Sequence, residues 1–171
     1  MTDRCLHLAD MIEVVADAIP DRPAVITSDA EYTYAQVDER ATRLANHLAA
    51  SGVVAGDHVG VHAMNRIEWV EAFYACFKIR AVPINVNYRY VEAELRYLYD
   101  NADCVAIIEA PEYSEAIDQV VDVLPKLHTR VQIGEQYEAA LAAASPERNF
   151  EPRSSDDLYI CLLYTSPSPR D

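Results

Sequence analysis

Glycine is scarce in this sequence. The 171 residues include four glycines, at Gly52, Gly56, Gly60 and Gly134. A dinucleotide-binding turn needs closely spaced glycines, because the backbone must approach the pyrophosphate without side chains in between. No two of these glycines are close enough to build one. No glycine- or hydroxyl-rich loop follows any predicted strand, so an independent flavodoxin-like nucleotide binder is disfavoured as well.

Cysteine, positive charge and long apolar runs are also limited. The four cysteines are widely spaced, which suits neither a disulfide framework nor a zinc site and predicts a reducing compartment. Lysine and arginine number 14 against 28 acidic residues, and the net charge of −14 argues against nucleic acid or anionic lipid as a partner. No run approaches the roughly 18 apolar residues of a membrane span, and the N-terminus has no apolar signal region. We therefore expect a cytoplasmic protein.

Short apolar segments alternate with amphipathic ones along the chain, as in a domain built from strands and helices. The composition, 51% hydrophobic and 25% charged, is ordinary for a globular domain. Strand patterns and helical spacing joined by short connections predict a parallel-rich sheet flanked by helices, an α/β fold. We expect strands near residues 24–27, 58–63, 82–86, 104–109, 130–133 and 158–164, and helices near 8–19, 34–51, 66–77, 91–98, 111–124 and 137–144.

Several positions carry signals for helix ends. Thr33 with Gln36 three residues later predicts a capping box, and Gly52 predicts the end of the same helix. Asn65 with Glu68 predicts a second helix start of the same kind. Residues 28–31 are polar and predict a turn, whereas residues 158–164 are apolar throughout and predict a strand in the middle of a sheet.

Two groups of residues could hold a metal ion. His58 and His62 are four apart, a spacing that suits a metal on a helix. On the strand predicted here they would lie about 13 Å apart, so a role on the surface or in a pocket wall is favoured. Asp156 and Asp157 could hold a cation, but turn formation before a strand is the commoner use of such residues. No metal ligand is assigned.

Residues 65–109, and above all the segment VPINVNYRYVEAELRYLYDNAD, resemble the AMP-forming acyl-CoA synthetases of the adenylate-forming ligase superfamily. The likeness is to bacterial fatty-acyl and sterol-side-chain CoA ligases and runs from about residue 8 to 165. It implies that residues 1–160 are a partial N-terminal subdomain of the ligase fold. It also implies ATP, Mg²⁺ and CoA as cofactors of the full-length enzyme, and a fatty or other hydrophobic carboxylic acid as substrate.

In this family a phosphate-binding loop, roughly Y-T-[SG]-G-T-T-G-x-P-K-G, follows a buried strand. Tyr164, Thr165 and Ser166 match its start, so Thr165 and Ser166 are candidates for a remnant of that loop. The sequence then departs from the pattern, and its prolines remove amide donors that an anion site would use. No lysine follows before the chain ends. We interpret residues 161–171, CLLYTSPSPRD, as a non-family tail, with translated sequencing adapter as the preferred origin and a frameshift or a chimaeric end as alternatives.

The segment after the predicted strand 82–86 is the most distinctive polar cluster. It could form a wall of the acyl or pantetheine channel, or a loop whose asparagines satisfy backbone groups while Arg89 pairs with Glu92 or Glu94. The loop is the favoured interpretation. The cluster comprises Asn85, Asn87, Tyr88, Arg89 and Tyr90, while Trp69, Phe73 and Phe77 are expected in the core.

The preferred hypothesis is an N-terminal fragment of an ATP-dependent acyl-CoA ligase that is inactive on its own. No catalytic residue is assigned, and no cofactor is expected to bind the fragment. The alternative is a non-enzymatic truncated α/β module that pairs with a full-length ligase. The oligomeric state is left open.

Overall fold

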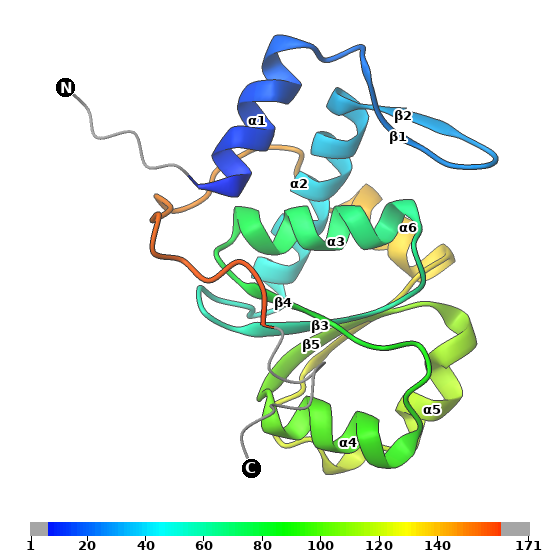
Figure 1. Cartoon of the computed structure of the whole chain (residues 1–171). Helices are drawn as coiled ribbons and strands as arrows, with labels where there is room; N and C mark the ends of the chain where they lie inside the picture. The colour runs from blue at the N-terminus through cyan, green and yellow to red at the C-terminus, as the bar shows by residue number, and fades with distance from the viewer. Residues whose placement is uncertain (1–6, 162–171) are drawn as a thin grey trace, which may run out of the picture.

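The computed structural model describes residues 7–161. Its centre is a four-stranded sheet in the order β4-β3-β5-β6, and β1 and β2 form an antiparallel hairpin (Figure 1). The elements are α1 (Leu8–Ala18), β1 (Pro23–Ile26), β2 (Glu31–Thr33), α2 (Tyr34–Ala50), β3 (His58–His62), α3 (Ile67–Lys78), β4 (Val82–Asn85), α4 (Glu92–Asn101), β5 (Cys104–Glu109), η1 (Pro111–Tyr113), α5 (Ser114–Asp118), η2 (Val121–Val123), β6 (Thr129–Gln132) and α6 (Glu135–Ala143).

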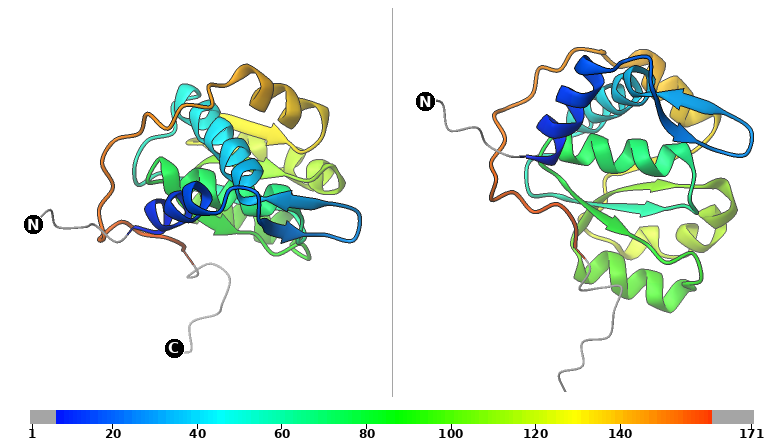
Figure 2. Two further views of the ribbon diagram at one scale, coloured as in Figure 1. Left: turned by 90° about the horizontal axis from the view of Figure 1, so that it is seen from above. Right: turned by 45° about the horizontal axis from the view of Figure 1, so that its top comes forward.

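Helices cover both faces of the four-stranded sheet. α2, α3 and α6 lie on one face, with α1 packed against α2 and α3, and α4 and α5 lie on the other (Figure 1, Figure 2). Every pair of neighbouring strands in this sheet is parallel. The predicted α/β class with a parallel sheet and flanking helices is therefore confirmed.

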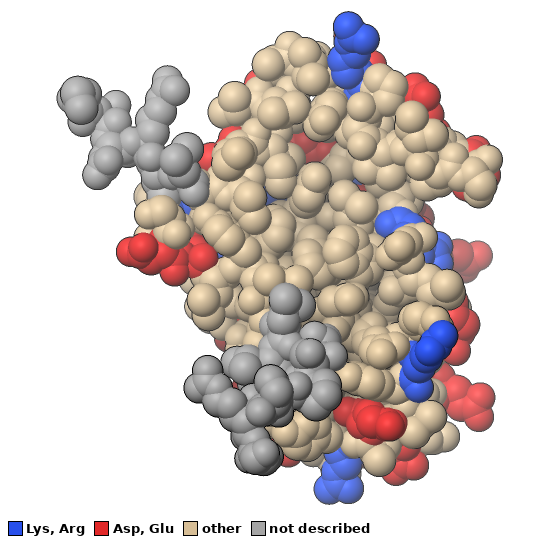
Figure 3. Space-filling model, viewed as in Figure 1, with Lys and Arg blue, Asp and Glu red and all other residues tan. Residues whose placement is uncertain are grey.

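The surface of the domain is uneven in charge. On the face shown in Figure 1, acidic and basic side chains lie mostly at the rim, and the middle of the face is uncharged (Figure 3).

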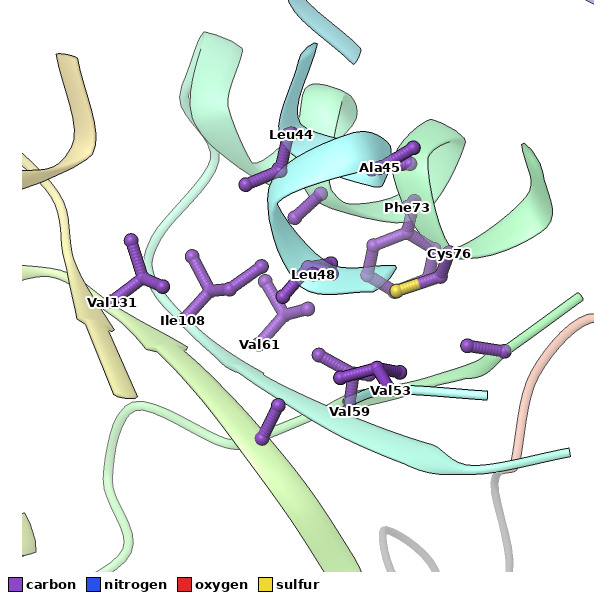
Figure 4. Close-up of a cluster of buried hydrophobic side chains, with 14 of the residues drawn as sticks. Leu44, Ala45, Leu48, Val53, Val59, Val61, Phe73, Cys76, Ile108 and Val131 are labelled. Atoms are coloured by element: carbon purple, nitrogen blue, oxygen red, sulfur yellow. The ribbon is translucent and has the colours of Figure 1, made fainter. Parts of the chain in front are cut away.

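The core on the α2 side of the sheet is built from the helical spacing seen in the sequence. Apolar residues of α2 recur every three or four positions, so one face of the helix packs on β3 and α3. Figure 4 shows α2 side chains above Val59 and Val61 of β3 and beside Phe73 and Cys76 of α3. The buried apolar residues of α2 are Val37, Ala41, Leu44, Ala45 and Leu48.

The ends of α2 also agree with the sequence. Thr33 Oγ1 accepts the N–H of Gln36, and the Gln36 side chain accepts the N–H of Thr33 at 2.8 Å, which completes the predicted capping box. Gly52 has φ +98° just beyond the helix, a conformation that glycine adopts without a steric penalty. Both predicted ends of this helix are confirmed.

The structure differs from the sequence prediction in the N-terminal hairpin and after Pro111. The segment predicted as a turn at residues 28–31 is followed by a second strand, β2, whose Glu31 pairs with Ile26. The single helix predicted for residues 111–124 is wrong, because the chain forms two short 3₁₀ turns around the five-residue α5. Branched valines at positions 120, 121 and 123 lower the helix propensity of this segment.

The last predicted strand is not formed in the part of it that the structure describes. Residues 158–161 have no strand conformation, and the side chains of Leu158 and Ile160 are 68% and 41% exposed. A strand that is apolar on both faces needs a paired neighbour and a cover on each side. Within residues 7–161 the segment has no ladder partner. Residues 162–164 of this prediction lie outside the described residues.

Candidate functional site

The carboxyl ends of the parallel strands form the candidate site, because ligands of α/β sheets bind at this edge. A cavity of about 760 Å³ lies between the β1–β2 hairpin, the connection from β3 to α3, and Glu112 of η1. Its walls are partly apolar and partly charged. It is lined by Val25, Ile26, Thr27, Ser28, Asp29, Tyr32, Met64, Asn65, Arg66, Ile67, Glu68, Trp69, Val70 and Glu112.

The floor of this cavity is the first turn of α3. The helix begins at Ile67, and Arg66 is the N-cap in an extended conformation with φ −154°. The Arg66 guanidinium donates to both carboxylate oxygens of Glu68, at 2.7 and 3.1 Å. The predicted capping box of Asn65 and Glu68 is therefore wrong, because Glu68 is held by the Arg66 side chain.

Trp69 connects the cavity to the core and to β4. Its ring stacks on Phe73 with centroids 3.9 Å apart, and its indole N–H donates to Asn85 Oδ1 at 3.2 Å. Phe73 and Phe77 belong to the buried cluster, as the sequence predicted. Trp69 packs against that cluster and also lines the cavity.

The polar loop after β4 is organised by its own side chains. Asn87 Oδ1 accepts the backbone N–H of Arg89 at 3.0 Å, as the loop interpretation expected. Arg89 donates to the Tyr88 hydroxyl at 3.0 Å and lies over the Tyr88 ring. Glu94 accepts the backbone N–H of Val91 at the start of α4. The predicted pairing of Arg89 with Glu92 or Glu94 is therefore replaced by a contact with Tyr88.

Two polar residues that the sequence did not bring together end neighbouring strands. His62 of β3 and Glu109 of β5 are paired in register, and both are fully buried. Burial lowers the pKa of His62 to about 4, so this imidazole is neutral at pH 7. The ring of Tyr113 stacks on it at 4.2 Å. Glu109 Oε1 accepts a hydrogen bond from the Arg130 guanidinium at 2.6 Å, so the two side chains form an ion pair.

The remaining candidates are dispersed. His58 and His62 are the first and last residues of β3, so the length of the strand separates them. The Nδ1 atom of His58 lies 2.5 Å from the Ala102 carbonyl oxygen. Asp157 binds Arg80 at 2.8 Å and accepts the N–H of Ser154, as a turn-forming residue would. Within residues 7–161, no group of three or more His, Cys, Asp or Glu side chains could hold a metal ion. The candidates Thr165 and Ser166 lie outside the described residues.

The glycines of the described residues are dispersed. Gly52, Gly56 and Gly134, the glycines with positive φ, each occupy a separate turn. The carboxyl edge nevertheless offers an open cavity with both apolar and hydrogen-bonding walls. This arrangement can orient a ligand, and in its wall the hydroxyls of Thr27 and Ser28 donate to Asp29 Oδ1, at 2.9 and 3.4 Å.

Comparison with known proteins shows the family to which the chain belongs. The model of the AMP-binding enzyme family matches residues 12–168, so the chain belongs to that family. The 3-oxocholest-4-en-26-oate–CoA ligase of Rhodococcus rhodochrous is 49% identical to it, and the medium/long-chain-fatty-acid–CoA/3-oxocholest-4-en-26-oate–CoA ligase of Mycobacterium tuberculosis is 43% identical. In each case the match covers 94% of this chain and 31% of the relative, so the chain spans about a third of their length.

Solved structures show the same fold. The N-terminal domain of FACL13 from Mycobacterium tuberculosis superposes with a TM-score of 0.84 at 23% identity, covering 90% of this chain and 40% of that one. The anthranilate CoA ligase AuaEII, solved with anthranoyl-AMP, gives a TM-score of 0.80 at 24% identity, covering 84% and 29%. These structures confirm the predicted N-terminal part of the ligase fold. The family model and the ligases of Rhodococcus and Mycobacterium confirm the predicted resemblance to AMP-forming acyl-CoA synthetases. No helix among the described residues is long and apolar enough to cross a membrane.

Proposed function

We propose that this chain is the N-terminal part of an ATP-dependent acyl-CoA ligase for a fatty or other hydrophobic carboxylic acid, such as a sterol side chain. In that reaction the carboxylate attacks the α-phosphorus of ATP and releases pyrophosphate. The CoA thiol then attacks the acyl-adenylate and releases AMP. The 49% identity to a sterol-side-chain CoA ligase over 94% of the chain is the observation that carries the proposal.

We also propose that the chain as it stands is inactive. Thr165 and Ser166 would be the remnant of the phosphate-binding loop, and the glycines and lysine of that loop do not follow them in this sequence. Adenylate formation depends on positioning two anionic reactants and neutralising the leaving pyrophosphate. ATP, Mg²⁺ and CoA would therefore be cofactors of the longer ligase. A cytoplasmic location is part of the same proposal.

The test is exchange of labelled pyrophosphate into ATP by a preparation of verified mass. We offer a long-chain fatty acid and a cholestenoic acid in turn, with the Rhodococcus relative as the positive control. We expect no exchange above a blank without protein, and no ATP binding by calorimetry. Exchange by this chain would overturn the proposed inactivity.

The assignment to a longer ligase has a separate test. The genomic sequence downstream of the Tyr164 codon should continue into a loop rich in glycine and threonine that ends in lysine. The protein translated from that complete gene should catalyse the exchange with one of the two acids. A stop codon directly after Asp171 in genomic DNA, or a complete product without exchange activity, would contradict the assignment.

A further inference from the structure

A segment without helix or strand follows α6 and runs back along α2 and α1 (Figure 1, Figure 2). We call residues 145–157 the strap. Its residues are exposed or half-buried as a whole, although it lies against three helices, and the Arg153 side chain is 8% exposed. Among the described residues, one backbone N–H of the strap donates to a backbone carbonyl: the Asp157 N–H donates to the Ser154 carbonyl, within the strap itself. The strap is therefore held to the domain by side chains.

Two polar side chains of α2 anchor the beginning of the strap. The Asn46 amide donates to the carbonyl oxygens of Ser145 and Glu147, at 2.7 and 3.0 Å. Just before the strap, Arg43 donates to the Ala144 carbonyl at 2.8 Å. These bonds hold its first residues and leave the rest to other contacts.

The central attachment is an ion cluster around a buried lysine. The Lys78 side chain is 1% exposed, and its Nζ lies 2.6 Å from Glu13 Oε1 of α1 and 2.7 Å from Asp38 Oδ1 of α2. Removing an ammonium group from water is costly unless carboxylates compensate for the lost hydration. The two carboxylates supply that compensation.

Two arginines of the strap complete this ion cluster. Arg148 donates to Asp38 at 2.6 Å and to Asp17 of α1 at 2.9 Å. Its side chain is 33% exposed, and that of Asp17 is 66% exposed.

Arg153, further along the strap, shares a carboxylate with the buried lysine. It donates to Glu13 at 2.9 Å, to Asp10 and to the backbone carbonyl of Lys78. The strap therefore shares both carboxylate partners of Lys78 and lies over it.

We propose that the strap is a cover that opens as a unit when its ion pairs are screened, and that opening makes the Lys78 amine a site for acylating electrophiles. Opening separates Arg148 and Arg153 from four carboxylates and Asp157 from Arg80, in a chain of net charge −14. The Arg148–Asp17 pair, with side chains 33% and 66% exposed, weakens with salt as the Debye length falls from roughly 14 to 3 Å between about 0.05 and 1 M. The Arg153–Glu13 pair, with side chains 8% and 15% exposed, is screened less. The apolar contacts that hold α3 in the core do not depend on charge, so this helix stays in place.

Lysine acetylation tests the proposal, because Lys78 and Lys126 are the lysines of the chain. Lys126 is 56% exposed and serves as an internal reference. With N-hydroxysuccinimidyl acetate, the unprotonated amine attacks the carbonyl carbon, an amide bond forms, and N-hydroxysuccinimide leaves as the nitrogen loses a proton. We expect the initial labelling rate of Lys78 relative to Lys126, measured by peptide mass spectrometry, to rise about tenfold between roughly 0.05 and 1 M NaCl.

Two charge-matched variants and a thiol complete the experiment. Asp17→Asn removes the outer partner of Arg148 and should raise Lys78 labelling at low salt about threefold, whereas Asp21→Asn, an exposed residue outside the cluster, should not. Cys76 is fully buried on the same helix as Lys78 and reports global unfolding. An effect of salt on Lys126 as large as on Lys78 would overturn the proposal. Equal behaviour of the two variants, or thiol labelling of Cys76 in parallel with Lys78, would overturn it as well.

Discussion

Replacing Gly60 by alanine tests how tightly β3 packs against α4. A Cβ atom at this position would lie 2.8 Å from Tyr99 Cε1 and 3.4 Å from Tyr99 Cδ1, closer than the 3.5–4.0 Å of an ordinary carbon contact. The Tyr99 ring is 1% exposed, and its hydroxyl lies 3.4 Å from His62 Nδ1. Overpacking of this kind costs about 1–3 kcal/mol, a large part of a typical stability of roughly 5–15 kcal/mol.

Urea unfolding followed by Trp69 fluorescence measures this cost, since Trp69 is the tryptophan of the chain and stacks in the core. With a urea dependence of about 1–3 kcal/mol per M, Gly60→Ala should lower the midpoint by about 1 M. In a Tyr99→Leu background the clashing ring atoms are gone, so the same substitution should cost much less. A cost below about 0.5 kcal/mol, or an equal cost in both backgrounds, would refute the packing argument.

Three further outcomes follow from the structure. Thr33→Ala should lower the free energy of unfolding by about 1 kcal/mol, read from urea midpoints, and no change would mean that the capping box contributes nothing. The hydrogen bond from Arg80 lowers the pKa of Asp157 below 3.8, so the stability that it contributes is complete above about pH 4 and is lost as pH falls through the lower folded-state pKa. Acid titrations should show this loss, and Arg80→Gln should remove it. The exposed Leu158 and Ile160 should promote binding of a hydrophobic dye and aggregation, and a dye-free monomer with reversible unfolding would contradict an incomplete fold.

Local signals in the sequence were sufficient for most of the layered architecture. The capping box at Thr33 and the positive-φ position of Gly52 depend on residues within a few positions of each other, and both were predicted. The parallel sheet followed from the alternation of strand and helix patterns. The failures have physical causes as well. Residues 158–161 are apolar, but a strand also needs a partner for its backbone, and no such partner lies among the described residues.

Contacts between distant charged residues were beyond sequence reasoning. Glu71 lies on α3 and is fully buried, and it accepts from Arg40 at 2.6 Å and from the Tyr137 hydroxyl at 2.6 Å. Those donors lie 31 and 66 positions away. A charged residue in a helical pattern is ordinarily expected on the solvent side, so the pattern gives no sign of its burial. The pairing of His62 with Glu109 was missed in the same way, because it depends on strand order.

Family membership and catalytic competence depend on different parts of this chain. Residues 65–109 carried the resemblance, and in the structure they form α3, β4, α4 and β5. β4 and β5 are strands of the sheet, while α3 packs on one face of it and α4 on the other. Their side chains pack into both hydrophobic clusters of the domain, and close packing restricts which residues fit there. Binding of ATP instead requires a phosphate-binding loop, which buried side chains do not supply. The residues that place the chain among the AMP-binding enzymes are therefore those that build the N-terminal fold of the ligases.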